Sequence, residues 1–260
     1  MEKISIFGVE IFNTTLEETM KIVSDFLDGE DTKVGFTPNT EIVMACRDDL
    51  ENRKLVNSAD LVVPDGIGLI YASKIHKKPL KERVTGFDIS MNILKMGREK
   101  PIKLYLLGGK DGIAKMAKAN IERDYEGIEV VGYHHGYFKG SQFDIYDDEK
   151  EQNIIEEINE LKPDVIFVGF GFPRQEKWIA HNRDILNTKF LIGNGGVIDI
   201  LAGVTKETPK IFVKLNLEWF YRLIKQPSRI IRQIALPKFL ISVLINKDSV
   251  KLEGDVNEQR

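Results

Sequence analysis

Short apolar runs alternate along this chain with longer segments whose apolar residues recur at helical spacing. One such pair is the helical segment at 14–27 and the apolar run at 33–37. The helical segment opens with Thr15 and Glu18, which have the spacing of a capping box, and its apolar residues share one face. The alternation therefore predicts helices and strands in regular succession.

The same alternation continues to about residue 200 and predicts an α/β fold. Near-continuous apolar strands are typical of a parallel sheet that helices cover on both faces. The predicted strands are 4–7, 33–37, 61–63, 103–107, 128–133, 164–170 and 189–193. The predicted helices are 14–27, 40–57, 66–76, 86–98, 113–125, 149–161 and 175–186.

Loops rich in glycine, proline, amide and charged residues follow six of these strands. In parallel α/β sheets, ligands bind beyond the carboxyl ends of the strands. We therefore expect a ligand site where these loops gather at one edge. The loops are TPNTE (37–41), PDGIG (64–68), GGKDG (108–112), HHGYF (134–138), GFPRQEKW (171–178) and NGG (194–196).

Asp65, in the second of these loops, has two interpretations. Proline, aspartate and glycine are preferred residues of a tight turn, which would give the carboxylate a purely structural role. At the mouth of a buried strand, the same carboxylate is also placed to act on a ligand. The residues of this loop alone leave both interpretations open.

Other candidates are neutral or cationic. Thr37, Asn39 and Gln175 carry hydroxyl and amide groups suited to orient polyhydroxylated or amide-bearing ligands. The alternative for Asn39 is helix capping, because it directly precedes a predicted helix. Arg83 is suited to pair either with Asp88 or with a ligand anion.

Several common kinds of site are not indicated. GGKDG lacks the spacing of the dinucleotide and P-loop motifs, so a strand-to-helix turn is favoured there. His134 and His135 are adjacent and have no further zinc ligand in view. The single cysteine, Cys46, excludes an intrachain disulfide. The pattern calls for no metal, no cofactor and no nucleic-acid partner.

Charge is unevenly distributed along an otherwise ordinary globular composition. The chain of 260 residues has a net charge of −3, yet residues 206–247 carry nine Lys and Arg against only Glu207 and Glu218. This basic segment is also apolar, but it falls short of the roughly 18 to 20 clean apolar residues of a membrane-spanning helix. Basic helices with Trp, Phe and Leu lie in membrane interfaces, and the alternative is a helical pair packed on the sheet.

These patterns predict three parts of the chain. They are an α/β core at 1–203, a basic apolar helical appendage at 204–247 and an acidic, disordered tail at 248–260. The appendage also allows self-association through its apolar residues. Within it, Arg222, Arg229 and Arg232 are spaced by seven and three residues, which puts their side chains on one helical side where they could hold a diphosphate.

The motifs together resemble those of the WecG/TagA/CpsF family, glycosyltransferase family 26, above all its TagA branch. That resemblance implies a Rossmann-like, metal-independent enzyme that is peripheral to the inner face of the cytoplasmic membrane. It implies inverting transfer of N-acetylmannosamine from UDP-N-acetylmannosamine to the 4-hydroxyl of N-acetylglucosamine on undecaprenyl diphosphate, in wall teichoic acid synthesis. The matching motifs are TPNTE, VVPDGIG, RVTGFD, LLGG, HHGYF, VGFGFPRQEKWI and LEWFYRL.

The resemblance also implies roles for individual residues. Asp65 matches the proposed general base, which takes the proton from the attacking hydroxyl. Arginines in the appendage would neutralise the leaving UDP where no metal does so. The residues matched to substrate binding are Thr37, Asn39, Arg83, Gln175, Arg222, Arg229 and Arg232.

The chain departs from the family pattern near residue 200, which leaves alternatives open. Where the family reads GVGGSFD, this chain has GNGGVID, so Asn194 and Val197 change the predicted donor pocket. Glu207 reverses a charge where the family has arginine. A related transferase with another donor, such as UDP-N-acetylmannosaminuronic acid, is therefore one alternative. A nucleotide-binding oxidoreductase and a catalytically silent membrane scaffold are the others.

Overall fold

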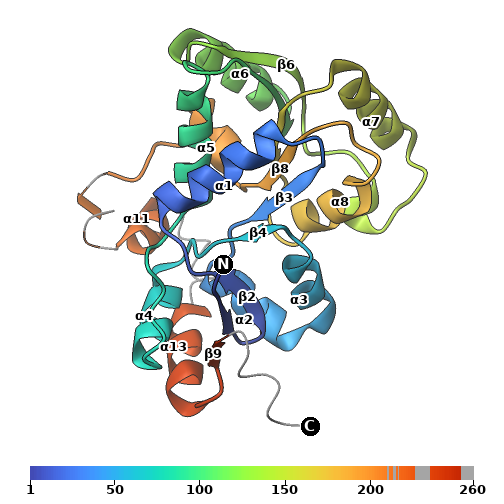
Figure 1. Ribbon diagram of the computed structural model, residues 1–260. Coiled ribbons are helices and arrows are strands. Elements are labelled where there is room, and N and C mark those ends of the chain that lie inside the picture. Colours follow the sequence, from blue (N-terminus) through green and yellow to red (C-terminus); the bar gives the residue numbers. More distant parts are fainter. Residues whose placement is uncertain (210, 213–214, 216, 226–234, 253–260) are drawn as a thin grey trace.

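The structure is a computed structural model that describes residues 1–209, 211–212, 215, 217–225 and 235–252, with the backbone alone at 222 and 225. Its central feature is a six-stranded sheet with the strand order β4-β3-β8-β7-β5-β6, in which all neighbouring strands are parallel (Figure 1). The predicted α/β class is confirmed. The strands are β3 (Lys33–Phe36), β4 (Leu61–Val62), β5 (Ile102–Gly108), β6 (Ile128–His134), β7 (Val165–Gly169) and β8 (Phe190–Gly193).

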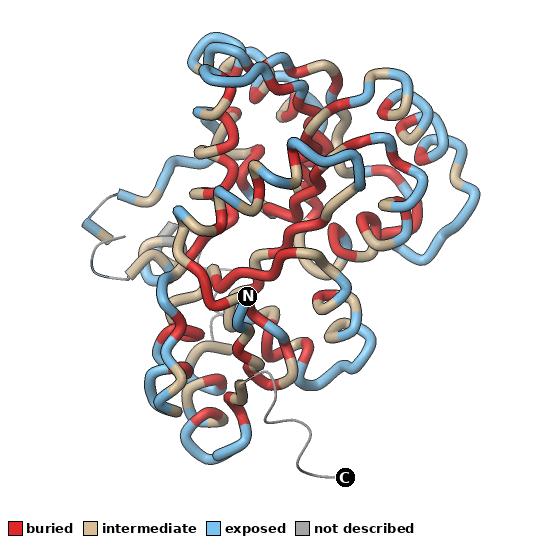
Figure 2. The backbone as a smooth tube through the Cα atoms, viewed as in Figure 1, coloured by how far each residue is buried: buried red, intermediate tan, exposed pale blue. Residues whose placement is uncertain are grey.

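Helices cover both faces of this sheet, as the apolar strands require. The strands form the buried centre of the upper part of the molecule (Figure 2). One face packs against α1 (Leu16–Asp28), α5 (Gly86–Met96), α6 (Ile113–Asp124) and α9 (Val197–Leu201). The other packs against α7 (Glu149–Leu161) and α8 (Arg174–Asn182), with the short 3₁₀ helix η1 (Ser141–Phe143) beside α8.

The predicted strand at 4–7 does not belong to the parallel sheet. It forms β1 (Lys3–Ile6), which pairs antiparallel with β2 (Val9–Phe12), a strand that the pattern did not predict. Phe7 and Gly8 join them with φ of 49° and 85°. A two-residue turn with both φ angles positive reverses the chain into a hairpin, so no crossover to a parallel neighbour follows.

The small sheet anchors a second core, to which the C-terminal part of the chain contributes. There α13 (Ala235–Ile245) buries Phe239 and Val243, and the ring centroids of Phe239 and Phe7 are 5.8 Å apart. β9 (Val250–Leu252) pairs antiparallel with β1, so this part of the predicted disordered tail forms a strand. The other helices packed into this core are α2 (Thr40–Asp48), α3 (Leu50–Asn57) and α4 (Ile67–Ile75).

Two helix predictions differ in outcome for reasons of capping. The capping box of α1 is confirmed, because Thr15 Oγ1 accepts from Glu18 N at 3.2 Å and Glu18 Oε2 accepts from Thr15 N at 2.9 Å. The single helix predicted at 40–57 is instead α2 and α3. Asp49 separates them, since its Oδ1 accepts from Glu51 N at 2.8 Å and starts a new helix.

The appendage is described only in part. Besides α13, the structure describes α11 (Glu218–Lys225), whose first residue bonds Arg83 in the segment that joins α4 to α5 (Figure 1). Of the helices in the described part of the chain, none is both long and apolar enough to cross a membrane.

Candidate active site

Asp65 lies where three loop segments meet at the carboxyl edge of the sheet. Its backbone N–H donates to Pro38 O at 3.1 Å, and the preceding Pro64 O accepts from Val84 N at 3.0 Å. The half-buried carboxylate accepts from Gly86 N, with an N–Oδ2 distance of 3.3 Å. The loop after β4 is therefore fixed between the loop after β3 and the segment that leads into α5.

The two glycines that follow Asp65 serve close packing rather than a turn. Gly66 has a φ of −91°, which any residue can adopt, and it is the N-cap of α4. A Cβ on Gly66 would lie 3.0 Å from Thr40 N, and one on Gly68 would lie 2.4 Å from Thr40 Cγ2. The absence of side chains lets the start of α4 approach the start of α2. The turn interpretation is wrong as an account of these glycines.

Thr37 and Asn39 lie beside Asp65 in the loop after β3, and they differ in what their side chains do. Asn39 Oδ1 accepts from Glu41 N at 2.9 Å and Ile42 N at 3.0 Å, so it caps α2. A ligand contact from Asn39 would therefore use Nδ2. Thr37 is half-buried, and its Oγ1 lies 2.9 Å from where a Cβ on Gly86 would be, so the start of α5 is close to it.

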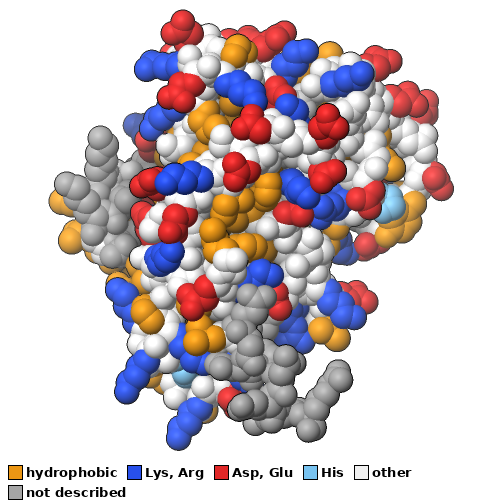
Figure 3. Space-filling model, in the orientation of Figure 1, with side chains coloured by type: hydrophobic (Ala, Val, Ile, Leu, Met, Phe, Trp, Pro, Cys, Tyr) orange, Lys and Arg blue, Asp and Glu red, His pale blue; other side chains and the backbone are white. Residues whose placement is uncertain are grey.

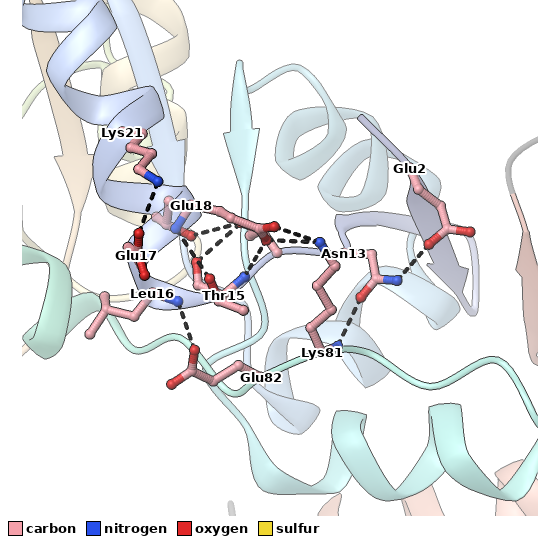
Figure 4. Close-up of polar contacts among 11 residues, drawn as sticks. Glu2, Asn13, Thr15, Leu16, Glu17, Glu18, Lys21, Lys81 and Glu82 are labelled. Atoms are coloured by element: carbon pink, nitrogen blue, oxygen red, sulfur yellow. Dashed lines mark hydrogen bonds and ion pairs between the residues drawn. The ribbon is translucent and has the colours of Figure 1, made fainter.

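Arg83 comes from a segment that is tied to the start of α1 (Figure 4). Lys81 Nζ bonds the Glu18 carboxylate at 2.7 Å, and Glu82 Oε2 accepts from Leu16 N at 2.8 Å. The bond from Lys81 is the main cause that lowers the pKa of Glu18. These contacts fix the two residues that precede Arg83.

In the structure Arg83 pairs with Glu218, the first residue of α11, and not with Asp88. Contact of Arg83 with a ligand anion stays a prediction. Arg83 Nη2 donates to Glu218 Oε1 at 2.7 Å, and both side chains are about five-sixths buried, with 16% and 15% exposed. Burial disfavours the charge on Arg83. The hydrogen bond and charge of Glu218, with smaller contributions from Asp65 and Asp88, outweigh it and raise the pKa of Arg83.

Gln175, on the first turn of α8, clamps the loops that follow two neighbouring strands. Its Oε1 accepts from Gly171 N at 3.0 Å, after β7, and from Gly195 N at 3.2 Å, after β8. Its Nε2 donates to Glu176 Oε1 at 2.9 Å. Because only 5% of this residue is exposed and both ends of its amide are bonded, the structure gives it a positioning role. Contact with a ligand stays a prediction.

Two polar groups near this clamp are buried without a partner among the described residues. They are Glu176 Oε2 and Asn194 Oδ1. Burial raises the pKa of Glu176 to about 7, although hydrogen bonds oppose the shift. Asn194 Nδ2 donates to Ser90 Oγ at 3.0 Å, and Ser90 in turn donates to Gly86 O at 2.7 Å. Gly86 is also the residue that donates to Asp65.

The three appendage arginines are not placed at the site. Arg222 lies in α11, but its side chain is outside the description, and Arg229 and Arg232 lie outside the described residues. The histidines have structural partners, since His134 Nδ1 is 2.8 Å from His135 O and His135 Nδ1 accepts from Tyr137 N at 3.1 Å. Within the described ranges, no three His, Cys, Asp or Glu residues gather as a metal site would require.

A separate groove of about 590 Å³ lies between α1 and α5. It is lined largely by Leu16, Met20 and Met96, and none of the sequence-predicted site residues lines it. It does not include the loops at the carboxyl ends of the strands. We therefore place the candidate site at the sheet edge around Asp65 and not in this groove.

Residues without a role in the sequence prediction also belong to this edge. Glu218 stands within the quoted LEWFYRL motif, and an acid in so basic a segment was the available signal. Asp199, in α9, is half-buried, and burial raises its pKa while Lys110 opposes the shift. Ser90 gave no signal, because an isolated serine on a predicted helix is unremarkable in sequence.

Comparison with known proteins gives consistent matches. Residues 4–252 match the glycosyl transferase WecG/TagA/CpsF family. A Staphylococcus aureus (strain MRSA252) protein named N-acetylglucosaminyldiphosphoundecaprenol N-acetyl-beta-D-mannosaminyltransferase is 33% identical over 251 residues, which is 96% of this chain and 95% of that protein. The protein of the same name from strain MW2 is 32% identical over the same shares.

Proposed function

This chain belongs to the glycosyl transferase WecG/TagA/CpsF family, and we propose that it transfers N-acetylmannosamine from UDP-N-acetylmannosamine to N-acetylglucosamine on undecaprenyl diphosphate, in wall teichoic acid synthesis. The acceptor's 4-hydroxyl oxygen attacks the anomeric carbon, the bond to UDP breaks, and the configuration inverts. The name of the Staphylococcus aureus relatives supports the sugar and the acceptor. Family membership sets aside the oxidoreductase alternative.

The observation that carries this proposal is the position of Asp65. A general base must reach the acceptor hydroxyl and keep a fixed orientation. The carboxylate of Asp65 is oriented by Gly86 N, at 3.3 Å, and stands beside Thr37 and Asn39 at the ligand-binding edge of the sheet. The acceptor proton passes to this carboxylate as the new glycosidic bond forms.

Departure of UDP requires positive charge near the diphosphate. Arg83 is one such cation among the described residues, and the charge of Asp65 contributes to its raised pKa. Arg222, Arg229 and Arg232 are proposed to supply the rest from the appendage. Independence from metal stays a prediction of the family resemblance.

The proposed location is the inner face of the cytoplasmic membrane, and one surface of the described structure supports it. The C-terminal half of α4 packs beside α13, where His76 Nε2 lies 3.0 Å from Val243 O. Figure 3 shows hydrophobic and basic side chains together at this lower left end. We call it the α4–α13 surface, and its exposed members are Tyr71, Lys74, Ile75, Lys77, Lys238, Ile241, Leu244, Ile245 and Lys247.

The α4–α13 surface has the composition that binds an anionic bilayer, and it lies about one short helix away from Asp65. Apolar side chains ringed by lysines enter the headgroup region of a membrane. Asp65 precedes the N-terminus of α4, and Lys74 lies near its C-terminus. A nine-residue helix is about 13 Å long, so the carboxylate would stand roughly that far from the surface on which the lipid-linked acceptor is held.

Reversing charge on this surface is expected to weaken membrane binding. Each lysine near an anionic bilayer contributes about 1 kcal/mol, so Lys74→Glu with Lys77→Glu should weaken binding at least about tenfold. Sedimentation with vesicles of phosphatidylglycerol and phosphatidylcholine measures it. The matched control is Lys115→Glu with Lys139→Glu, two exposed lysines away from α4 and α13. Equal losses in both pairs would contradict this orientation.

The function itself is tested by UDP release from the full-length protein. We expect release only when UDP-N-acetylmannosamine and the lipid-linked N-acetylglucosamine diphosphate are both present. Release should be slower with UDP-N-acetylglucosamine or UDP-N-acetylmannosaminuronic acid. Preference for the uronic acid would move the assignment to the related transferase. Release from none of the donors would overturn the proposal.

A further inference from the structure

Arg83 and Glu218 form an ion pair between the catalytic edge and the appendage. The Nη2–Oε1 distance is 2.7 Å, and about five-sixths of each side chain is buried. A second ion pair joins the appendage to the C-terminal end of α2, and it is longer and more exposed, with 3.8 Å between Lys238 Nζ and Asp48 Oδ2. A short, buried pair between charged groups is much the stronger contact of the two.

The charges around Arg83 are unbalanced for a site that receives a diphosphate. Three carboxylates, on Glu218, Asp65 and Asp88, act on this one guanidinium. A sugar nucleotide brings further negative charge on its diphosphate. With Glu218 in place, that diphosphate would meet a guanidinium already bound to an anion and a surrounding field that repels it.

We propose that Glu218 is an internal anion that holds Arg83 in the ligand-free enzyme, and that the diphosphate of the sugar nucleotide takes its place. This inference rests on the proposed function, because it takes a nucleoside diphosphate as the ligand. A guanidinium binds carboxylate and phosphate oxygens through the same planar set of N–H donors. Arg83 can therefore exchange one anion for the other without a change in its own position.

The exchange has a consequence for the appendage. Glu218 begins α11, and the next two residues, Trp219 and Phe220, are exposed by 38% and 42%. When Glu218 leaves Arg83, the first turn of α11 loses its tie to the catalytic edge. Coupling between two binding events is reciprocal, so a surface that draws Trp219 and Phe220 away should also raise the affinity for the diphosphate.

UDP binding to the full-length protein tests the exchange directly. Glu218→Gln keeps the shape of the side chain and removes its charge, so the Kd for UDP measured by calorimetry should fall about tenfold. Arg83→Gln should raise the Kd. In the Arg83→Gln background, adding Glu218→Gln should have little further effect, because the competition for the guanidinium no longer exists. Asp48→Asn is the matched control and should leave the Kd unchanged.

The pattern across these variants separates exchange from other roles. An unchanged or higher Kd in Glu218→Gln would overturn the inference, since Glu218 would then position Arg83 in the bound state as well. An equal gain in the Arg83→Gln background would also overturn it, because Glu218 would merely repel UDP. An equal gain in Asp48→Asn would assign the effect to general loosening of the appendage.

Tryptophan emission supplies a readout of α11 itself. Trp178 is fully buried in the core, whereas Trp219 adjoins Glu218, so UDP should change the emission of Trp219. The change should be absent in Trp219→Phe and already present without UDP in Glu218→Gln. Acceptor-dependent transfer by the wild-type protein tests the proposed function independently of the exchange. Transfer with an unaltered Kd in Glu218→Gln would reject the exchange and keep the function, whereas neither transfer nor UDP binding would reject both.

Discussion

Replacing Asp65 with asparagine is expected to lower kcat for acceptor-dependent transfer by about 10²- to 10⁴-fold, the usual contribution of a general base. In the wild-type protein Gly86 N lies 3.3 Å from Asp65 Oδ2. Asparagine keeps an oxygen that can accept this hydrogen bond, so the loop should keep its shape. It cannot accept the proton of the acceptor hydroxyl. The Kd for UDP should change little, and this separates loss of chemistry from loss of structure.

The measurement is UDP release under saturating donor and lipid-linked acceptor, with calorimetry of UDP binding in parallel. Asp88→Asn is a demanding control, because Asp88 also acts on the charge of Arg83 and accepts from Thr85 Oγ1 at 2.6 Å. Its activity should fall far less. If Asp65→Asn retained kcat within a few-fold of the wild type while binding UDP, Asp65 would return to a structural role.

Replacing Glu176 with glutamine is expected to stabilise the protein at pH 8. The carboxyl is almost wholly buried, Oε2 has no partner among the described residues, and burial raises its pKa to about 7. In the wild-type protein Gln175 Nε2 lies 2.9 Å from Glu176 Oε1. Glutamine resembles the protonated acid, and its amide oxygen can still accept this hydrogen bond. It therefore removes the need to bury a charge or to bind a proton.

The effect has a defined sign and range of pH. Since the folded-state pKa exceeds the unfolded value of 4.5, the stability associated with this group is fully present below pH 4.5 and is lost as pH rises through about 7. A shift of this size corresponds to about 3 kcal/mol. The variant should thus gain up to about 3 kcal/mol in the free energy of unfolding at pH 8 and little at pH 4.5. Urea unfolding at both pH values measures the difference.

Glu151→Gln is the matched control, with the same substitution at another buried glutamate. Both carboxylate oxygens of Glu151 accept hydrogen bonds, from Ser141 N at 2.8 Å, Asn182 Nδ2 at 3.0 Å and the Ser141 hydroxyl. Glutamine replaces one of these accepting oxygens with an NH2 group, which would then face hydrogen-bond donors. This variant should therefore lose stability at pH 8. A loss in Glu176→Gln as well would show that its carboxylate is stabilised by a charge partner and that the raised pKa is wrong.

The position of Glu176 links its effect on stability to the candidate site. Glu176 follows Gln175, whose amide joins the loops after β7 and β8 through Gly171 and Gly195. A buried, partly unsatisfied carboxyl beside that clamp lowers stability where the site is built, as is common at functional sites. The activity of Glu176→Gln should therefore be measured alongside its stability.

The strands of the parallel sheet were predictable because the central ones are buried on both faces and read as apolar runs, whereas the edge strand β6 alternates buried and exposed residues within a β-branched run. All six predicted runs from 33–37 to 189–193 became strands of the sheet, within two residues of their bounds. The run at 4–7 has the same appearance but belongs to a hairpin. Only positive φ at Phe7 and Gly8 distinguishes the two cases, and Phe7 is not a residue that signals such a turn.

The candidate site was predictable to the level of its loops and not to the level of its contacts. Parallel strands bring their carboxyl ends together, so Thr37, Asn39 and Asp65 were expected at one edge. The cap by Asn39 Oδ1, the clamp by Gln175 and the contact of Gly68 with Thr40 depend on how α2, α4 and α8 approach the sheet. Those distances arise from packing between segments far apart in sequence.

By itself, the sequence determined the α/β class and the family, and it predicted the edge that carries the candidate site, because these depend on local periodicity and on short motifs. The tertiary structure alone decided that Phe239 closes a core with Phe7, and that Arg83 pairs with Glu218, 135 residues away, instead of Asp88. A side chain chooses its partner by distance and burial in the folded chain. Spacing along the sequence carries no information on either once the residues lie in different elements.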